Sequence, residues 1–378
     1  MSSKVLISGG AGFIGSRLAF ALASEGHMVT ILDNLSPQIH GDSPEKSQSV
    51  ASLQKIANLI VGDVRKREDW QKVIEGQEVV VHLAAETGTG QSMYEIAKYV
   101  DVNVTGTALL LETIQTRRSQ VEKVVVASSR AIYGEGKYRC ASHGIVYPEA
   151  RSDLDMARGD FAAKCPVCGV SADSLPTDES SLIHPISIYG MTKHDQERMV
   201  HSVCGSMGMP SIGLRYQNVY GPGQSLKNPY TGILSIFSTR IRNRNPLNIF
   251  EDGNESRDFV YISDIVEATK AAIMSTFTGQ ESLNIGCGIP VTVREVALFL
   301  REMYSSDVGI SVSGNYRIGD IRTNYADISK AKRILGYSPT IAFSEGIRDF
   351  ANWVMGQDLE KDNFEASMDE LRKIGLAR

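Results

Sequence analysis

Short apolar runs and amphipathic stretches alternate through the first half of the chain. Runs rich in Val, Ile and Leu that are bounded by Gly, Asp or Ser are typical of strands in a parallel sheet, and helical spacing between them is typical of the helices that cover such a sheet. Helices are predicted over Phe13–Ser24, which stops at Gly26, over Ile96–Arg117 and over Ser187–Met207. The predicted strands are Lys4–Ser8, Met28–Asp33, Asn58–Val61, Glu78–Leu83, Lys123–Ser128 and Ser211–Tyr216.

Three regions lack this rhythm. Residues 34–55 are polar with little pattern, which predicts a surface loop and a short helix. Residues 135–182 contain Gly, Pro, Cys, Asp and Ser without a long periodic run, so we expect an insertion between a strand and the next helix. Long loops of this kind are usually functional or separately stapled. The charged stretch 357–378 is predicted to be a solvated helix.

The arrangement predicts an α/β fold, with a Rossmann-type doubly wound parallel sheet and a smaller mixed α/β substrate domain. Residues 1–210 would form the dinucleotide-binding domain, including the insertion. Residues 211–378 would form most of the substrate-binding region, and some of their segments would return to the Rossmann sheet.

Composition narrows the class of protein. Hydrophobic residues make up 42% and charged residues 22% of the chain, as in ordinary soluble enzymes. The formal net charge is −5 without a dense basic stretch, which argues against nucleic acid as the main partner. The apolar run at residues 5–7 is too short for a signal-peptide core, and no apolar run is long enough to span a membrane. We therefore expect a cytoplasmic protein whose five cysteines form no disulfide framework.

A glycine-rich turn, GGAGFIG at residues 9–15, follows the first predicted strand and leads into the first helix. Glycines 9, 12 and 15 allow a tight turn whose amides approach a pyrophosphate. Asp33 ends the second strand, where its carboxylate can accept hydrogen bonds from a ribose; the alternative is a capping role. Asn34 and Leu35 follow it with no Arg nearby, so NAD is favoured over NADP. Asp63, after the third strand, fits an adenine contact and a helix cap equally well.

A Tyr and a Lys, Tyr189 and Lys193, share one face of a predicted helix. A neighbouring ammonium favours the phenolate, which suits Tyr189 to act as a general base. Ser129 follows at the end of the fifth sheet strand, on the edge where ligands bind in open α/β sheets. An exposed Tyr–Lys pair is the alternative, and the combination with the glycine turn disfavours it.

These motifs resemble the extended short-chain dehydrogenase/reductase family, and within it the NAD-dependent nucleotide-sugar epimerases and dehydratases, over about residues 4–350 apart from the insertion. The resemblance implies a homodimer formed through helices near 96–117 and 187–207. It selects Ser129 rather than Ser128, so the implied catalytic residues are Ser129, Tyr189 and Lys193. The implied cofactor residues are Gly9, Gly12, Phe13, Ile14, Gly15, Asp33, Asn34, Asp63, Val64, Leu83, Ala84, Ala85, Asn103, Tyr189 and Lys193.

The same resemblance implies the substrate contacts. Asn218, in LRYQNVYGPG, would touch the diphosphate or sugar, and Arg257 and Arg322 would pair with the diphosphate. Guanidinium groups suit phosphate because they bind two oxygens at once. Without the motifs, each arginine would fit a surface salt bridge. Together with Ser129 and Arg130, these residues form the expected binding site of a dTDP- or UDP-linked sugar.

The family's dehydratases usually carry an Asp-Glu pair after the catalytic hydroxyl residue, and here Arg130 and Ala131 stand in its place. We therefore expect C4 epimerisation, in which Tyr189 takes the proton from the sugar O4 while C4 gives a hydride to NAD. The segment 128–140 most resembles the dTDP-L-rhamnose 4-epimerase branch, whose product is dTDP-6-deoxy-L-talose. A UDP-hexose or uronate 4-epimerase, a 4-keto-sugar reductase and a non-catalytic NAD-binding redox sensor remain alternatives.

The insertion makes the separation of Ser129 and Tyr189 about twice the family's usual one. It contains Cys140, His143, Cys165 and Cys168 as two pairs with metal-ligand spacing. Such a set can close around a structural zinc and so order a loop without a core of its own. Four unrelated residues in a polar loop are the alternative.

Overall fold

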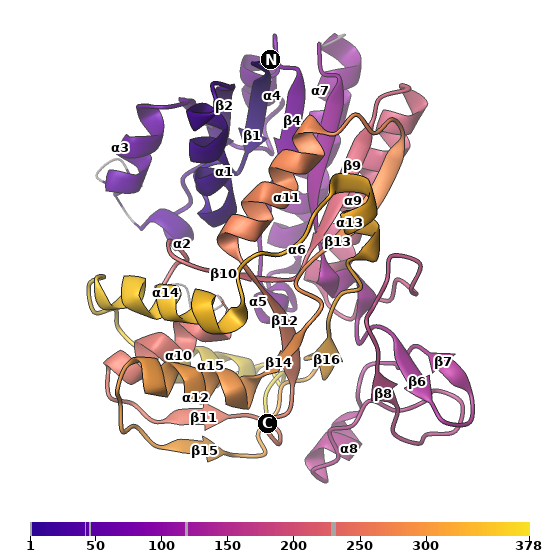
Figure 1. Ribbon diagram of the computed structural model, residues 1–378, viewed down its shortest axis with the longest axis vertical. Helices are drawn as coiled ribbons and strands as arrows, with labels where there is room; N and C mark the ends of the chain where they lie inside the picture. Colours follow the sequence, from indigo (N-terminus) through magenta and orange to yellow (C-terminus); the bar gives the residue numbers. More distant parts are fainter. Residues whose placement is uncertain (1, 42, 45–46, 118–119, 228–231) are drawn as a thin grey trace.

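A seven-stranded parallel sheet, in the order β13-β9-β5-β4-β1-β2-β3, lies at the centre of the computed structural model (Figure 1). The model describes residues 2–41, 43–44, 47–117, 120–227 and 232–378. The strand order reverses between β1 and β4, and ligands of doubly wound folds bind at this switch point. The predicted Rossmann-type sheet is therefore confirmed. Its strands are β1 (Lys4–Ser8), β2 (Met28–Asp33), β3 (Asn58–Val61), β4 (Val79–His82), β5 (Lys123–Ser129), β9 (Ser211–Tyr216) and β13 (Gln280–Ile285).

Helices cover both faces of this sheet because successive strand residues point to opposite sides. In β1, Val5 and Ile7 pack on the face of α1, and Leu6 packs on the face of Trp70. Each such fully buried aliphatic side chain stabilises the fold by about 1.5–3 kcal/mol. One face carries α1 (Phe13–Ser24), α3 (Gln48–Gln54), α11 (Ile262–Met274) and α13 (Ser329–Leu335), and the other carries α4 (Arg67–Val73), α7 (Gly106–Arg117) and α9 (Ile188–Ser206).

The helix predicted over Ile96–Arg117 is present, but it is not α-helical throughout. It consists of α6 (Ile96–Tyr99), a π-helical turn over Val100–Thr105 and α7. Such turns often occur at functional sites, and this one contains the fully buried Asn103. In the polar region 34–55, α2 (Pro37–His40) and α3 form as short helices, while residues 42 and 45–46 lie outside the described residues.

A second apolar core lies beyond the carboxyl edge of the sheet. Leu234, Phe237, Val296, Leu300 and Phe350 meet there. Although they follow residue 210, β9, β13 and α11 belong to the main sheet and its covering layer. The elements of the second part are α10 (Ile233–Arg242), α12 (Val293–Met303), α14 (Phe343–Met355), β10 (Asn218–Tyr220), β11 (Leu247–Ile249), β12 (Ser256–Tyr261), β14 (Pro290–Thr292), β15 (Ile310–Val312) and β16 (Thr323–Asn324).

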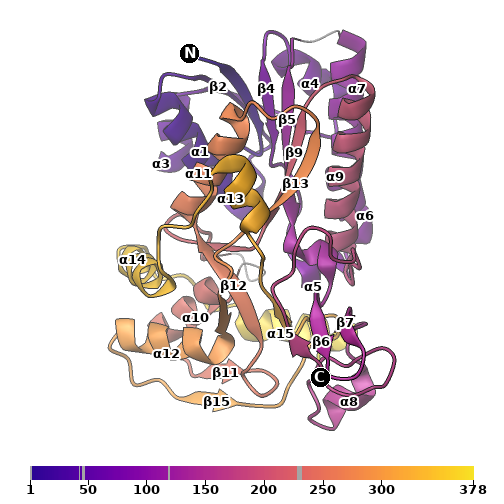
Figure 2. The ribbon, with the colours of Figure 1, turned by 45° about the vertical axis from the view of Figure 1, so that its right-hand side comes forward.

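The insertion folds as a small unit beside the second part of the chain (Figure 2). Its three-stranded sheet has the order β7-β6-β8, and one short helix, α8, follows β7. A small core of Tyr138, Cys140, Val146, Ala163 and Cys165 lies within it. The bounds are β6 (Tyr138–Cys140), β7 (Gly144–Val146), α8 (Asp153–Ala157) and β8 (Asp173–Ser174).

The C-terminal stretch corrects one prediction. The helix α15 (Phe364–Lys373) is not solvated all round, because Met368 and Leu371 are buried against a cluster that includes Tyr94 and Phe250. Phe364, Met368 and Leu371 recur at helical spacing, so a chain segment of charged composition still carries one apolar face. No helix in the described parts of the chain is long and apolar enough to cross a membrane.

Candidate active site

A cavity of about 880 Å³ follows the carboxyl ends of β1, β2 and β4. Its size is that of a small-molecule or cofactor site. The glycine turn forms its floor, and most of the predicted cofactor residues line it. These are Gly9, Gly12, Phe13, Ile14, Gly15, Asp33, Asn34, Val64, Leu83, Ala84, Ala85, Tyr189 and Lys193.

Close backbone packing explains the glycines of this turn. A Cβ on Gly15 would lie 2.4 Å from the carbonyl oxygen of Gly9, and Gly9 itself has a φ of +71°. Asp33 fixes the turn from the end of β2, because its carboxylate accepts hydrogen bonds from the amides of Ala11 (2.9 Å) and Leu35 (2.8 Å). The turn therefore presents its amides at the start of α1 in the way that a pyrophosphate requires.

Two predicted cofactor residues lie outside the set of described residues that line this cavity. The carboxylate of Asp63 is held by Arg65, whose guanidinium lowers the pKa of Asp63 through hydrogen bonds of 2.7 and 3.0 Å. Asn103 accepts a hydrogen bond from the amide of Glu86 (2.8 Å) and donates one to Thr192 (3.0 Å). Asn103 thus joins the loop after β4 to α9.

Ser129 and Tyr189 line both the cofactor cavity and a second cavity, while Lys193 lines the first alone. Ser129 is the last residue of β5, and its hydroxyl accepts a hydrogen bond from the amide of Ala131 (3.1 Å). Tyr189 lies in the first turn of α9, next to Gly190. A Cβ on Gly190 would lie 2.5 Å from the carbonyl oxygen of Ala131, so the glycine lets α9 approach the turn after β5. The Ser129 side chain lies close enough to the Tyr189 phenol to favour its ionised form.

Burial raises the pKa of the Tyr189 phenol, and the Ser129 side chain and the charge of Arg130 oppose this rise. Among the described residues, Arg130 is the cation that lowers the pKa of this phenol. The sequence suggested Lys193 for that role. In the structure the Lys193 ammonium is buried, donates to Gln196 (2.6 Å), and has a pKa lowered to about 7 by burial. The proximity of Arg130 to the phenol could not be predicted from spacing along the chain.

The second cavity, of about 330 Å³, extends from Ser129 and Tyr189 into the second part of the chain. Arg130 and Asn218 line it together, joined by a hydrogen bond of 2.7 Å from the guanidinium to the amide oxygen. Burial lowers the pKa of Arg130 to about 9, and the nearby charge of Arg257 adds to this effect. Other lining residues include Phe250, Arg257, Arg317, Asp320, Met368 and Leu371.

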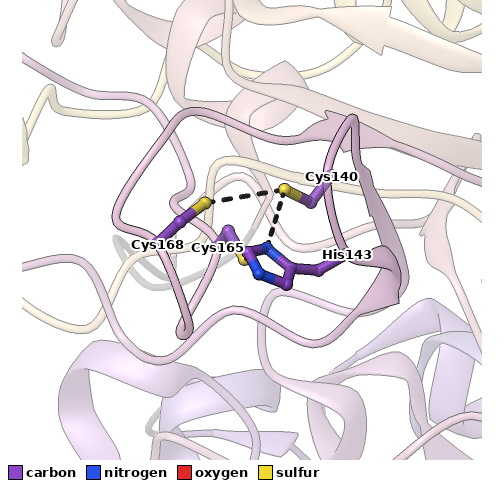
Figure 3. Close-up of side chains that lie close together, drawn as sticks. All are labelled: Cys140, His143, Cys165 and Cys168. Atoms are coloured by element: carbon purple, nitrogen blue, oxygen red, sulfur yellow. Dashed lines mark hydrogen bonds between the residues drawn. The ribbon is translucent and has the colours of Figure 1, made fainter.

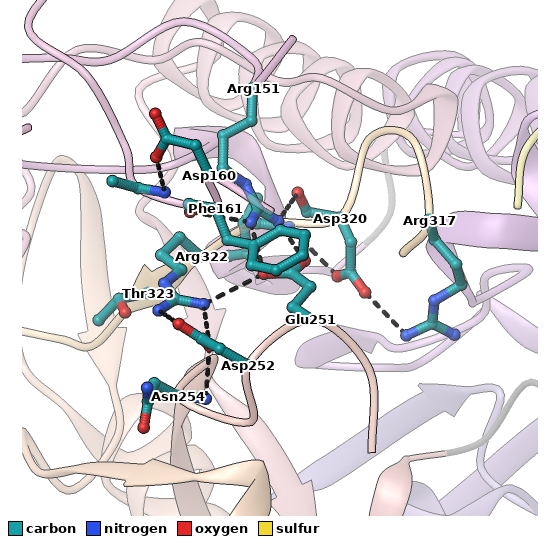
Figure 4. Close-up of polar contacts among 12 residues, drawn as sticks. Arg151, Asp160, Phe161, Glu251, Asp252, Asn254, Arg317, Asp320, Arg322 and Thr323 are labelled. Carbon is teal, nitrogen blue, oxygen red and sulfur yellow. Dashed lines mark hydrogen bonds and ion pairs between the residues drawn. The ribbon is translucent and has the colours of Figure 1, made fainter. Parts of the chain in front are cut away.

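Arg317 and Arg322 differ in where they point (Figure 4). The predicted substrate residue Arg322 is not among the described residues that line the cavity, and it forms a bidentate ion pair with Asp252, with both contacts at 2.7 Å. Arg317, which the sequence analysis missed, lines the cavity and contacts Asp320 at 2.7 Å. Arg257 reaches the other oxygen of Asp320 at 3.0 Å. Arg257 and Arg317 therefore converge on one carboxylate at the cavity wall.

Cys140, His143, Cys165 and Cys168 converge in the insertion (Figure 3). Their ligand atoms all lie within 4.8 Å of one another. The Sγ atoms of Cys140 and Cys168 are 3.7 Å apart. The Nδ1 atom of His143 lies 3.5 Å from Cys140 Sγ and 3.6 Å from Cys165 Sγ. The hydrogen bond to His143 lowers the pKa of the Cys140 thiol to about 6.

The comparisons identify the family. The model of the NAD-dependent epimerase/dehydratase family matches residues 5–148 and 161–286. The chain therefore belongs to this family. Residues 149–160, between the two matched parts, lie within the insertion.

Individual relatives match nearly the whole chain. A dTDP-L-rhamnose 4-epimerase of Burkholderia thailandensis is 35% identical over 95% of this chain and 97% of its own length. The UDP-glucose 4-epimerase of Thermotoga maritima, solved with UDP-glucose, has a TM-score of 0.75 at 28% identity, covering 93% of this chain and 99% of that one. The UDP-glucuronic acid 4-epimerase of Bacillus cereus, solved with UDP-glucuronic acid and NAD, has a TM-score of 0.76 at 27% identity, with the same coverage.

Proposed function

We propose that this protein is an NAD-dependent 4-epimerase of a nucleotide-diphosphate sugar. The observation that carries the proposal is the position of Ser129 and Tyr189 at the junction of two cavities. The cavity on one side has the glycine turn and Asp33 that suit a dinucleotide. The cavity on the other side has Arg257 and Arg317, which suit a diphosphate.

The chemistry follows from these two hydroxyls. NAD, when bound, supplies the acceptor that takes a hydride from the sugar C4 and returns it to the opposite face. Tyr189, as phenolate, takes the proton of the O4 hydroxyl and gives it back after the sugar has turned. Ser129 donates a hydrogen bond to the O4 oxygen as its carbonyl character develops. Arg130, next to the phenol, favours the phenolate, and Lys193 is suited to hold the nicotinamide ribose.

For the substrate, Arg257 and Arg317 would bind the diphosphate, while Arg322 would act indirectly by holding Asp252. Asn218 and Arg130 would contact the sugar side. A dTDP-linked 6-deoxyhexose such as dTDP-L-rhamnose is supported by the dTDP-L-rhamnose 4-epimerase that is 35% identical to this chain. The UDP-sugars named with the solved relatives are the second candidate class.

The test is NMR of the purified protein with dTDP-L-rhamnose and no added cofactor. We expect a second sugar to grow to equilibrium without nicotinamide consumption, with coupling constants that identify C4. Tyr189→Phe should lose at least about 10³-fold in kcat while it retains NAD, and full activity in this variant would overturn the assignment of the base. If dTDP-L-rhamnose is unchanged, UDP-glucose and UDP-glucuronic acid follow, and a requirement for added NADH would instead favour a reductase.

We also propose a homodimer formed through α6, the π-helical turn and α9. Ile96, Val100 and Met191 are large apolar side chains that are between 41% and 47% exposed, and the three segments are packed together. Apolar residues gathered on one exposed face suit an isologous interface. Light scattering should give twice the chain mass, and Ile96→Glu should give a monomer. A monomeric wild-type protein would overturn this proposal.

We further propose that Cys140, His143, Cys165 and Cys168 bind a structural zinc in a cytoplasmic protein. A tetrahedral zinc with bonds of about 2.3 Å to sulfur and 2.0 Å to nitrogen separates its ligands by about 3.5–3.8 Å. Three of the six pairs of ligand atoms lie 3.5, 3.6 and 3.7 Å apart, and all six lie within 4.8 Å. A disulfide would bring two sulfurs to about 2.0 Å. Elemental analysis should find one zinc per chain, and Cys165→Ser should lose it. Metal-free wild-type protein, prepared without chelator and with reduced thiols, would overturn the assignment.

A further inference from the structure

Residues 316–323 carry Arg317 and Asp320 to the wall of the second cavity, and little regular structure supports them. The strand β16 begins at Thr323, and an isolated antiparallel bridge joins Arg317 to Ala377. The backbone of residues 376–378 is therefore one support of the segment, and the insertion is the other. The contacts of the insertion help to determine where the two cavity residues lie.

Arg151, in the insertion, makes the central contact (Figure 4). Its guanidinium donates to both carboxylate oxygens of Glu251 (2.6 and 2.8 Å), to the carbonyl oxygen of Asp320 (2.8 Å) and to that of Phe161 (3.2 Å). It also forms an ion pair with Glu135 at 3.2 Å. The side chain is only 3% exposed. Both terminal nitrogens of this buried guanidinium donate hydrogen bonds, while its Nε makes only the ion-pair contact with Glu135. Such a group holds the residues around it in one geometry.

Two further contacts hold the ends of the segment. At its start, the ring of Tyr316 packs against that of Phe161 with a centroid distance of 6.4 Å, and the Tyr316 hydroxyl donates to Asp153 (2.8 Å). At its end, the Tyr138 hydroxyl donates to the carbonyl oxygen of Thr323 (3.1 Å). The insertion therefore contacts residues 316–323 at the start, in the middle and at the end of the segment.

Two of the residues that make these contacts lie close in the sequence to members of the Cys/His cluster. Tyr138 lies in the same strand as the cluster residue Cys140, and Phe161 lies four positions before Cys165. The core between them is small, so metal ligation would supply the order that apolar burial cannot. Arg151 falls in residues 149–160, between the two parts that the family model matches.

We propose that the insertion, residues 135–182, is a metal-ordered clamp that positions Arg317, and the Asp320 carboxylate that holds it, so that Arg317 can bind the nucleotide diphosphate, with Arg151 as the positioning residue. The inference rests on the proposed function and on the proposed metal site. It assigns the metal a role in substrate affinity and none in the chemical step. NAD binding depends on the glycine turn, so it is independent of the clamp.

The test measures binding without turnover, by calorimetry of the NAD-containing protein with dTDP and with UDP. Arg151→Met should raise the Kd of the preferred nucleotide at least tenfold and raise the KM of the sugar nucleotide similarly, with kcat changed less than threefold. NAD content should stay at the wild-type level. Arg151→Lys should recover part of the loss because it keeps the charge. Arg158→Met, an exposed arginine of the same insertion, is the matched control and should behave as wild type.

A milder variant and the metal-free wild-type protein complete the test. Arg151→Met removes one cation from the buried carboxylates Glu135 and Glu251 and can prevent folding. Tyr316→Phe, which removes only the hydroxyl bound to Asp153, is therefore the milder variant, and it should raise the Kd two- to fivefold. Metal removal from the wild type should reproduce the Arg151→Met Kd. Unchanged nucleotide affinity in the folded variants and in the metal-free protein would overturn the clamp. Wild-type protein that binds nucleotide tightly but epimerises no sugar would refute the proposed function and leave the clamp standing.

Discussion

The ion pair between Arg215 in β9 and Glu197 in α9 should be among the most important single interactions for stability. Arg215 contacts both carboxylate oxygens of Glu197, at 2.6 and 3.0 Å, and the side chains are 8% and 2% exposed. Arg215 also donates to the Tyr133 hydroxyl (2.6 Å), and Ser282 donates to Glu197 (2.8 Å). The pair therefore holds the helix that carries Tyr189 against β9, the strand next to the edge of the sheet.

Two routes give a similar magnitude for Arg215→Met. Removal of one partner from a buried ion pair generally costs about 3–5 kcal/mol, because the other charge is left uncompensated. Burial opposes ionisation of Glu197, yet its hydrogen bonds and charge contact with Arg215 prevail and lower its pKa from 4.5 to about 2. A shift of that size corresponds to about 3 kcal/mol. The loss is a large part of the 5–15 kcal/mol that stabilises a typical domain.

Urea unfolding followed by circular dichroism, at fixed protein, NAD and metal concentrations, measures this loss. Arg372→Met, which removes an exposed pair with Asp369, is the control and should cost less than about 0.5 kcal/mol. The double variant Arg215→Met with Glu197→Leu should recover much of the stability, because no buried charge remains. A single-variant loss below about 1 kcal/mol, or a double variant that costs the sum of both single changes, would refute the reasoning.

Four further predictions concern the pH dependence of stability, the glycine turn, the ionisation of Tyr189 and the wall of the second cavity. Because the folded pKa of Glu197 lies below its ordinary value, the pair's contribution should be complete above about pH 4.5 and lost as the pH falls towards 2, as urea midpoints across this range would report. Gly15→Ala should abolish NAD retention, measured by absorbance of the denatured protein's supernatant, whereas Gly309→Ala, with open space around its Cβ, should retain NAD. Arg130→Met should move the rise of kcat with pH upward by about 1 unit or more, since the charge that favours the phenolate is lost; an unmoved profile would remove Arg130 from that role. Leu371→Lys should raise the sugar-nucleotide KM at least tenfold without loss of NAD, and an unchanged KM would show that α15 does not border the bound substrate.

The sequence predicts six of the seven strands of the central sheet, and the edge strand β13 is not among them. Strands that are buried on both faces appear as continuous Val, Ile and Leu runs between polar or glycine boundaries. The buried strands β1, β2 and β9 and the partly exposed edge strand β3 begin and end at the predicted residues. The glycine turn could be predicted for a related reason, since its requirements are local. Gly9 needs a positive φ and Gly15 needs room for a carbonyl oxygen, and both constraints act within a few residues.

Other features depend on contacts between residues far apart in the sequence. Arg317 and Arg322 lie in the same irregular segment, where no periodicity distinguishes the residue that faces the cavity. Arg322 does not face the cavity because it pairs with Asp252, which lies 70 positions away in the sequence. The π-helical turn before α7 leaves no trace in the hydrophobic pattern. The apolar face of α15 is visible in the sequence, but its partner Phe250 is not.

The residues of the chemical step could be predicted from local patterns, whereas the residues that select the substrate depend on contacts between distant parts of the chain. The glycine turn and Asp33, which form the part of the cofactor cavity that suits a pyrophosphate and a ribose, lie in one strand-helix-strand unit, so related sequences with different substrates share this pattern. The second cavity is assembled from the end of β5, the start of α9, the segment 316–323 and α15, which come together only in the folded chain. The residues that choose among sugar nucleotides should therefore be sought in Phe250, Met368 and Leu371 and in the position of Arg317, because Ser129 and Tyr189 act on whichever sugar these walls admit.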